Sequence, residues 1–235
     1  MKASDLDAST ATVVDFPLRG EWTALNTPAE RIPSHGTDFF AQRFALDFIR
    51  LDWTTQRPGR GATWRHLLLG VPASSFYCWN QPVRSAFAGR VIAVGDGWPD
   101  RKRVHGLWEL LRVNVAVFGS YSAGDDFWPL TGNFVVLEGE PGVALYAHLR
   151  QGSIGVDPGD EVPSGTRLGA VGNSGNSTMP HLYFQLMDGP DPRTAAGRLC
   201  AFRGYERYAQ GAWQPVAVGV PGRLERVRPA YSFAE

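Results

Sequence analysis

The chain has 235 residues, of which 43% are hydrophobic and 20% charged, a composition typical of a globular protein with a sizeable core. Aromatic residues make up 12% of the chain beside 27 Gly and 17 Pro, which disfavours disorder and coiled coil and predicts short strands joined by many turns. Because 23 basic residues balance 23 acidic ones, no net positive charge favours nucleic acid as a partner.

Strand signals recur along the chain as runs of β-branched and aromatic residues bounded by Gly and Pro. Residues 1–30 are polar and are expected to form an irregular lead-in. The predicted strand segments cover residues 44–52, 82–94, 133–139, 142–149, 159–172 and 181–188, with loop-rich insertions at 53–75 and 95–130 and a proline-containing C-terminal wrap from residue 189. The fold class that follows is all-β, an antiparallel core with inserted loops.

Cysteine content and the start of the chain bear on its environment. Cys78 and Cys200 have no metal-knuckle spacing, so two buried free thiols are expected, with a single long-range disulfide as the alternative. The first ten residues contain one Lys and no apolar segment, and no stretch approaches the roughly 18 apolar residues of a membrane span. A cytoplasmic location is the default expectation, and a secreted or periplasmic one stays open.

Two predicted strands carry polar residues that can do chemistry. Asp47 shares a strand face with apolar neighbours, where a carboxylate is costly unless it is paired, binds a metal or faces solvent. His181 and Tyr183 lie two residues apart and project from one face, an arrangement compatible with metal binding or general base catalysis, or simply with a polar surface patch. His148 ends another strand and is by itself compatible with a surface histidine.

Taken in order, these residues belong to a longer pattern. Tyr-Ala-His-Leu at 146–149 precedes a Gly-Asp-x-Val-x-x-Gly segment at 159–165 and Val-Gly-Asn-Ser-Gly-Asn-Ser at 171–177, and Pro-His-Leu-Tyr-Phe follows at 180–184. The pattern resembles the lysostaphin-type (LytM-like) zinc metallopeptidases, glycyl-glycine endopeptidases that cut peptidoglycan cross-bridges. Upstream, His35-Gly36-Thr37 followed by Ala-Leu-Asp-Phe at 45–48 resembles the first metal-ligand segment of this family.

The resemblance implies a fold and a division of the chain. It implies the antiparallel β core of the lysostaphin type, similar to a duplicated hybrid motif, as a peptidase-like domain over residues 31–200. Residues 1–30 would precede this domain, and residues 201–235 would form a C-terminal extension packed on it.

The resemblance also implies a zinc cofactor and roles for five residues. His35 and Asp47 match the first two zinc ligands, and His148 and His181 match the catalytic histidines. Tyr183 stands where the family has its third zinc-ligand histidine, and this is the main departure from the family pattern.

A tyrosine at a ligand position changes the expected metal chemistry. A phenol with a pKa near 10 must ionise to bind zinc well, whereas imidazole binds in its neutral form. Three outcomes follow: a zinc site with a tyrosinate ligand at Tyr183, a weak two-ligand site, or no metal. His66 or His105 are candidates for a substitute ligand, and Asp38, three residues after His35, matches the family context less well than Asp47.

The functional expectation is a zinc metallopeptidase-like protein that hydrolyses peptide bonds in peptidoglycan cross-bridges or Gly-rich peptides. The alternative is a catalytically impaired homologue whose groove binds a peptide, a glycan or a partner protein. The expected partner is a peptide or a peptidoglycan fragment, and neither nucleic acid nor a membrane span is expected. A biotinyl- or lipoyl-type carrier is excluded, because such a carrier needs a Lys at a β-turn and no Lys follows Lys102.

Overall fold

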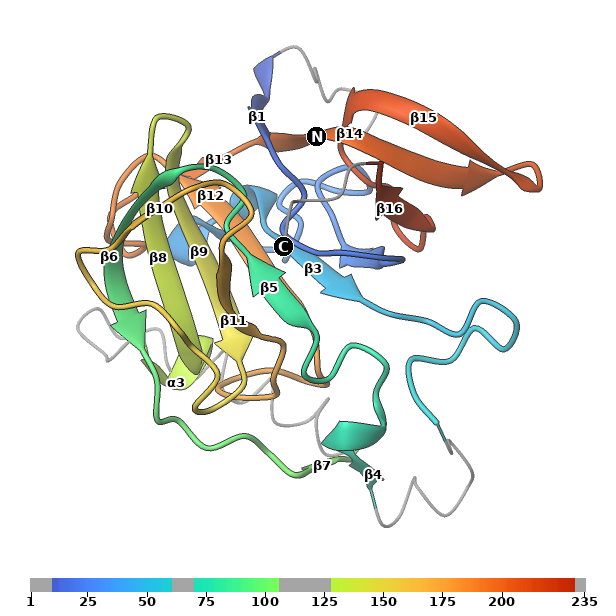
Figure 1. Cartoon of the computed structure of the whole chain (residues 1–235), viewed down its shortest axis with the longest axis horizontal. Helices are drawn as coiled ribbons and strands as arrows, with labels where there is room; N and C mark the ends of the chain where they lie inside the picture. The colour runs from blue at the N-terminus through green and yellow to red at the C-terminus, as the bar shows by residue number, and fades with distance from the viewer. Residues whose placement is uncertain (1–9, 61–69, 106–127, 231–235) are drawn as a thin grey trace.

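The computed structural model describes residues 10–60, 70–105 and 128–230, and most of its regular structure is β-strand (Figure 1). The strands are β1 (Thr12–Val14), β2 (Thr23–Asn26), β3 (Leu46–Ile49), β4 (Val71–Pro72), β5 (Pro82–Arg84), β6 (Gly89–Gly95), β7 (Arg103–Val104), β8 (Asn133–Gly139), β9 (Gly142–Leu149), β10 (Glu161–Val162), β11 (Arg167–Ala170), β12 (Leu182–Met187), β13 (Gly197–Arg198), β14 (Cys200–Ala209), β15 (Ala212–Gly219) and β16 (Val227–Pro229). The helical elements are two 3-10 segments, η3 (Phe39–Phe44) and η4 (Ala73–Ser75), and the four-residue helix α3 (Trp128–Thr131). The predicted all-β class is confirmed.

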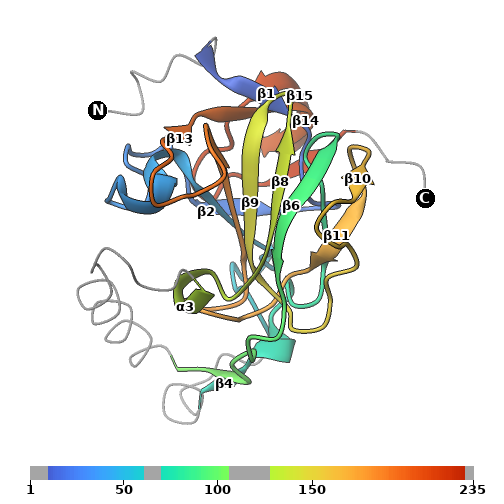
Figure 2. The same ribbon diagram turned by 90° about the vertical axis from the view of Figure 1, so that its left-hand side faces the viewer.

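One large antiparallel sheet forms the centre of the molecule. Its strands follow the order β10-β6-β8-β9-β12-β3-β2, and β13 pairs with β12 at one end. Figure 2 shows β6, β8 and β9 side by side in this sheet, with the β14–β15 hairpin above them. Strands β9, β12 and β3, which carry the family-like motifs, are therefore consecutive neighbours.

The two ends of the described chain form a second sheet that the sequence did not predict. Strand β1 pairs in parallel with β14, and β14 pairs antiparallel with both β15 and β16. The expected irregular lead-in is therefore wrong for β1 and β2, and the expected C-terminal wrap is a regular hairpin followed by a short strand. The reason is that strand partners from distant parts of the chain satisfy backbone groups in segments whose own sequence carries few strand signals.

The middle strands of the main sheet are buried on both faces. Strands β9 and β12 have almost no exposed residue, and alternate side chains enter two different hydrophobic clusters. Tyr146 and Phe184 face the larger cluster, in which Phe16, Phe48 and Phe202 contact one another with ring centroids 4.9–5.7 Å apart. The opposite face is free to present polar side chains without opening the main core.

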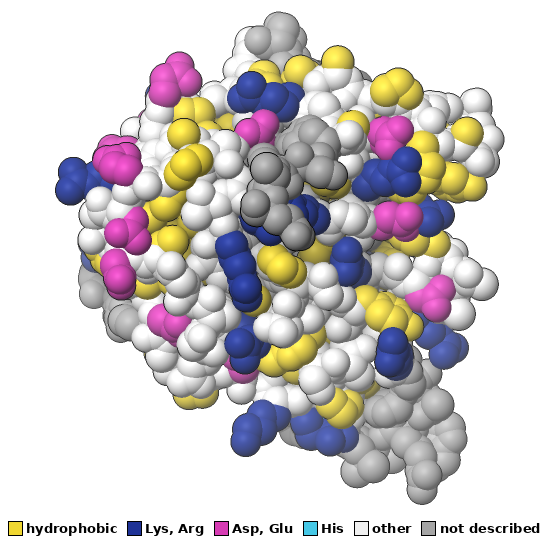
Figure 3. All heavy atoms as spheres, viewed as in Figure 1, with side chains coloured by type: hydrophobic (Ala, Val, Ile, Leu, Met, Phe, Trp, Pro, Cys, Tyr) yellow, Lys and Arg dark blue, Asp and Glu magenta, His cyan; other side chains and the backbone are white. Residues whose placement is uncertain are grey.

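Other expectations about the chain can be compared with the described residues. Cys78 and Cys200 are buried and free, as expected. No helix within the described ranges reaches the length and apolarity that a membrane-spanning helix needs. The face seen in Figure 3 carries both acidic and basic side chains with hydrophobic ones between them, in keeping with the balanced formal charge. The proposed division into domains stays a prediction.

Tyr146 provides a test of how the core is held together. Its buried hydroxyl accepts a hydrogen bond from the backbone N–H of Ala86 at 2.8 Å. Tyr146→Phe leaves that buried N–H without its acceptor and should lower the free energy of unfolding by about 1–3 kcal/mol. Chemical denaturation measures the change, and Tyr208→Phe, at a side chain that is 39% exposed, is the matched control with little expected effect. Equal stability of both variants would contradict the assigned role of this hydrogen bond.

Candidate active site

The polar residues singled out from the sequence meet in one pocket on the face of the sheet opposite the larger core cluster. The pocket has a volume of about 320 Å³, and its lining includes His35, Asp47, His148, His181 and Tyr183. These residues are spread over nearly 150 positions of sequence, so the sheet order brings them together. Their chemical roles stay predictions.

A row of paired residues across four neighbouring strands makes the floor of the pocket. Tyr183 on β12 lies opposite Asp47 on β3 and opposite Ala147 on β9, and Asp47 in turn lies opposite Asn26 on β2. Paired residues on adjacent strands point to the same face of a sheet. The register therefore fixes Asp47 and Tyr183 as immediate neighbours.

A bulge directs His148 into this pocket. Strict alternation would place His148 and Ala147 on opposite faces of β9, yet both line the pocket. The pairing of β8 with β9 shifts register between Asn133 and Val135, and His148 has a φ of +61°, in the left-handed region. A bulge of this kind re-aims a side chain, which explains how a residue next to Ala147 reaches the same cavity.

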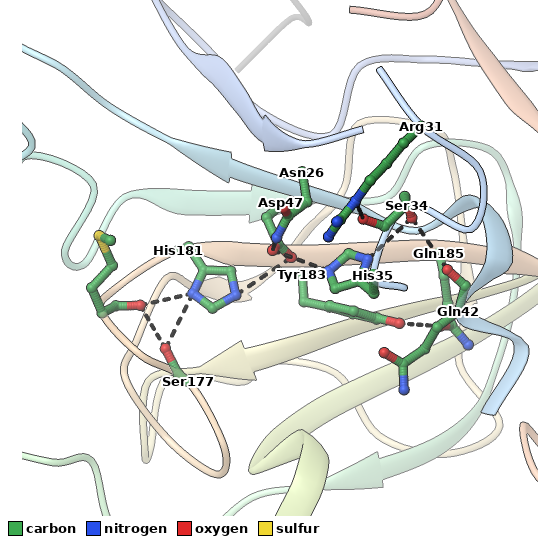
Figure 4. A network of polar contacts seen from close by, with 11 residues as sticks. Asn26, Arg31, Ser34, His35, Gln42, Asp47, Ser177, His181, Tyr183 and Gln185 are labelled. Atoms are coloured by element: carbon green, nitrogen blue, oxygen red, sulfur yellow. Dashed lines mark hydrogen bonds and ion pairs between the residues drawn. The ribbon is translucent and has the colours of Figure 1, made fainter. Parts of the chain in front are cut away.

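Asp47 lies at the centre of the polar contacts (Figure 4). Its Oδ2 accepts a hydrogen bond from Nδ2 of Asn26 at 2.6 Å and lies 3.0 Å from Nε2 of His35. Its Oδ1 is buried and has no hydrogen bond from the residues that the structure describes, and Nε2 of His181 lies 3.5 Å away. One carboxylate therefore has an imidazole on each side.

Each of the three histidines is oriented through its Nδ1 atom. Nδ1 of His181 lies 2.7 Å from the carbonyl oxygen of Met179, and Nδ1 of His148 lies 3.0 Å from that of Ser174. Because a carbonyl only accepts, both Nδ1 atoms carry a proton, and Nε2 is the atom left for the pocket. Nδ1 of His35 lies 3.1 Å from the Ser34 hydroxyl.

Burial and neighbouring charges set the protonation of the site. Burial raises the pKa of Asp47, but the nearby His35 and His181 outweigh it and hold that pKa well below its usual range. Burial lowers the pKa of His181, while the Asp47 carboxylate raises it, with a net rise. Burial, helped by His181, lowers the pKa of His148 to about 3. At neutral pH the site holds an ionised carboxylate and a neutral His148.

Tyr183 directs its phenol away from Asp47. In Figure 4 the ring extends from β12 toward Gln185, and the hydroxyl donates a hydrogen bond to Gln185 Oε1. Nε2 of Gln185 donates to the backbone oxygen of Phe40 at 3.0 Å, which fixes the orientation of the amide. Tyr183 thus contacts His35 and His148 through its ring, with centroids 5.3 and 5.9 Å apart.

The donors in the pocket fit a cation only in part. Within the described ranges, no group of three or more His, Cys, Asp or Glu side chains is arranged to hold a metal ion. Two features nevertheless suit one: Oδ1 of Asp47, which receives no hydrogen bond from the described residues, and the 3.0 Å separation between Asp47 Oδ2 and Nε2 of His35. His35 and Asp47 are the residues that would hold zinc, and the third donor is not in place.

Two of the remaining candidates from the sequence lie outside the pocket, and the third is not among the described residues. His105 packs against Gly70 beside the β4–β7 pair and does not line the pocket. Asp38 forms an exposed ion pair with Arg43 at 2.8 Å, so it is not part of the site. His66 falls outside the described residues. Neither His105 nor Asp38 therefore serves as a substitute ligand.

Sequence reasoning missed Asn26 and Gln185. Asn26 lies in the segment expected to be irregular, and only the pairing of β2 with β3 places it beside Asp47. The sequence could have predicted Gln185, because it follows Tyr183 at a spacing of two residues and therefore shares its strand face.

Comparison with known proteins agrees with the motifs. The sequence profile of peptidase family M23 matches residues 115–194, a segment shorter than half of the chain, and confirms the predicted resemblance there. No match was found among curated protein sequences.

Among solved structures, the chain resembles three peptidases at low identity. The catalytic domain of the prophage-encoded M23 protein EnpA from Enterococcus faecalis has 16% identity, coverage of 66% of this chain and 73% of that one, and a TM-score of 0.36. Lysostaphin from Staphylococcus simulans has 20% identity, coverage of 65% and 40%, and a TM-score of 0.36. A zinc-containing peptidase from Vibrio cholerae has 20% identity, coverage of 77% and 37%, and a TM-score of 0.36. The chain thus spans less than half of the latter two proteins.

The carboxylate at the centre of the site gives a test of its electrostatics. Asp47→Asn removes the charge that raises the pKa of His181, so burial is then opposed only by the hydrogen bond to Met179 and that pKa should fall. A titration of the histidine ring protons by NMR, with a chelator present, follows the change. Asp38→Asn, at an exposed ion pair, is the control that should leave the His181 titration unchanged. If the titration of His181 were the same in Asp47→Asn as in wild type, the electrostatic contact between Asp47 and His181 would be refuted.

Proposed function

We propose that the chain, whose residues 115–194 match peptidase family M23, is a zinc-dependent peptidase that acts on Gly-rich peptides such as those of peptidoglycan cross-bridges. One observation supports this proposal above the others. A buried, ionised carboxylate, Asp47, lies in the floor of a pocket between two imidazole nitrogens, and its Oδ1 receives no hydrogen bond from the described residues. Such a carboxylate is costly to bury unless a cation balances it.

His35 and Asp47 would hold the metal in this pocket. A zinc ion held there would supply a Lewis acid able to polarise the carbonyl of a peptide bond and to lower the pKa of a water molecule. Asn26 keeps the Asp47 carboxylate in one orientation through its hydrogen bond to Oδ2. The Ser34 hydroxyl does the same for the His35 ring, and it also bonds to the backbone oxygen of Gln42 at 3.2 Å.

His148 would act as the hydrogen-bonding histidine of the reaction. The low pKa that follows from its burial keeps Nε2 unprotonated at neutral pH, so this atom accepts a hydrogen bond inside the pocket. The hydrogen bond from Nδ1 to Ser174 fixes the ring orientation. A peptide that enters the pocket would displace water from around His148, which strengthens its electrostatic contacts.

A second candidate function follows from the orientation of Tyr183. Its hydroxyl is bonded to Gln185, and three metal-ligating side chains are not assembled among the described residues. A protein that binds a peptide in the same pocket without cleaving it fits these two observations. Binding without hydrolysis is the outcome that separates this function from the first.

The peptidase proposal is tested by cleavage of a Gly-rich peptide in the presence of zinc. Wild type should cleave the peptide, a chelator should stop cleavage, and His148→Ala should lower kcat by about 100-fold or more through loss of its hydrogen bond in the pocket. His105→Ala, at a histidine outside the pocket, is the matched control and should keep full activity. Peptide binding without cleavage by wild type, seen in calorimetry, would support the second function instead.

A further inference from the structure

We infer that one end of the pocket is a subsite for an apolar side chain, made by Phe40, Leu145, Ala147 and the ring of Tyr183. The inference rests on the proposed function of the pocket and narrows its substrate class, since the peptide then carries a residue such as Leu, and not Gly, on one side of the cleaved bond. Three features of this apolar subsite carry it: its floor, its polar groups and its wall.

The floor of the pocket changes from polar to apolar along strands β9 and β12. Tyr183 lies opposite Asp47 on one side and opposite Ala147 on the other. Two residues further along β12, Gln185 lies opposite Leu145, and paired residues share one face of the sheet. Because a strand rises about 3.3 Å per residue, Leu145 lies about 7 Å beyond the row that contains Asp47. A peptide held at Asp47 therefore places a neighbouring side chain within reach of this floor.

The apolar floor rests on a hydrophobic cluster separate from the larger core. Leu145, Ala147 and Tyr183 belong to it, and its other buried members are Ala41, Ala45, Val136, Val143 and Met187. The pocket above has a volume of about 320 Å³, within the range of sites that bind small ligands. Glycine has no side chain to place there. An apolar side chain that covers Leu145 and Ala147 removes apolar surface from water, which favours binding.

The polar groups at this end of the pocket are engaged with one another. The Tyr183 hydroxyl donates to Gln185 Oε1. The Gln185 amide nitrogen has two N–H groups, and it donates to the backbone oxygen of Phe40 at 3.0 Å and to the sulfur of Met187 at 2.8 Å. A polar side chain of a ligand would have to replace these buried hydrogen bonds at a cost in free energy. An apolar side chain leaves them intact.

The wall at Phe40 has a backbone conformation that its surroundings impose. Phe40 and Ala41 have φ of +55° and +60°, in the left-handed region that residues other than Gly adopt at a cost in free energy. The hydrogen bond from Gln185 holds the carbonyl of Phe40. Gly197 lies so close to Ala41 that an added Cβ would be 2.4 Å from the Ala41 carbonyl oxygen. A wall that is fixed before a ligand arrives loses little conformational freedom on binding, and Tyr183 is a positioning residue for it through Gln185.

Three hexapeptides test the apolar subsite on the wild-type protein. One is hexaglycine, and the other two carry a single Leu immediately before or immediately after the central bond. One of the Leu peptides should bind at least about tenfold more tightly than hexaglycine, because the burial of a Leu side chain supplies that difference. Calorimetry with a chelator present measures binding without cleavage, and kcat/KM with zinc present compares the same peptides as substrates.

Phe40→Ala and Phe39→Ala form a matched pair at neighbouring positions of η3. Phe40 lines the pocket, whereas Phe39 is 64% exposed and is not among the lining residues. Phe40→Ala should lose most of the preference for Leu, and Phe39→Ala should keep it. Gln185→Met removes the hydrogen bond to Phe40 and should also lower the preference, which tests the wall even if Phe40→Ala fails to fold. Circular dichroism of each variant verifies that the β fold is retained.

The outcomes separate the apolar subsite from the proposed function. Equal affinity and equal kcat/KM for the three peptides would overturn the subsite and leave the peptidase proposal standing. A preference for Leu that persists in both Phe40→Ala and Gln185→Met would also overturn it, because the preference would then arise elsewhere in the molecule. A wild-type protein that neither binds nor cleaves any of the three peptides would overturn the proposed function itself, and the subsite with it.

Discussion

The pocket depends on one constraint, which is that the carboxylate of Asp47 is buried and needs charged or hydrogen-bonding partners in place of water. Removing Asp47 from water is favourable only if groups of opposite charge or hydrogen-bond donors replace the lost solvation. Asn26, His35 and His181 provide that environment, and each comes from a different segment of the chain. The positions of these segments therefore determine whether the carboxylate can be buried at all.

Both ends of the chain take part in positioning Asn26. Strand β2, which ends at Asn26, is held on one side by β3 and on the other by C-terminal residues, because Trp22 and Val227 exchange backbone hydrogen bonds of 2.9 Å. The Thr27 hydroxyl also donates to the backbone oxygen of Pro221 at 2.7 Å. The second sheet is therefore more than a cover for the core, since it supports a strand that carries a partner of Asp47.

Tyr183 shows how hydrogen bonding within one strand sets which atoms face a pocket. Its phenol points away from Asp47 and donates to Gln185, which lies two residues along on the same face. The ring keeps its contacts with His35 and His148, so the pocket wall stays filled. With the phenol turned away, the ring nitrogens of His35 and His181 are the groups that lie beside the Asp47 carboxylate.

The sequence by itself determined the all-β class, the antiparallel strands from 133 to 188, and the motifs that point to peptidase family M23. It also singled out Asp47 and Tyr183, because local alternation and motif spacing are properties of neighbouring residues. Tertiary structure alone decided that Asn26 belongs to the site, that a bulge brings His148 into the pocket, and that the Tyr183 hydroxyl faces Gln185. The physical reason is that register, bulges and hydrogen-bond partners depend on contacts between strands far apart in the chain, which no local pattern encodes.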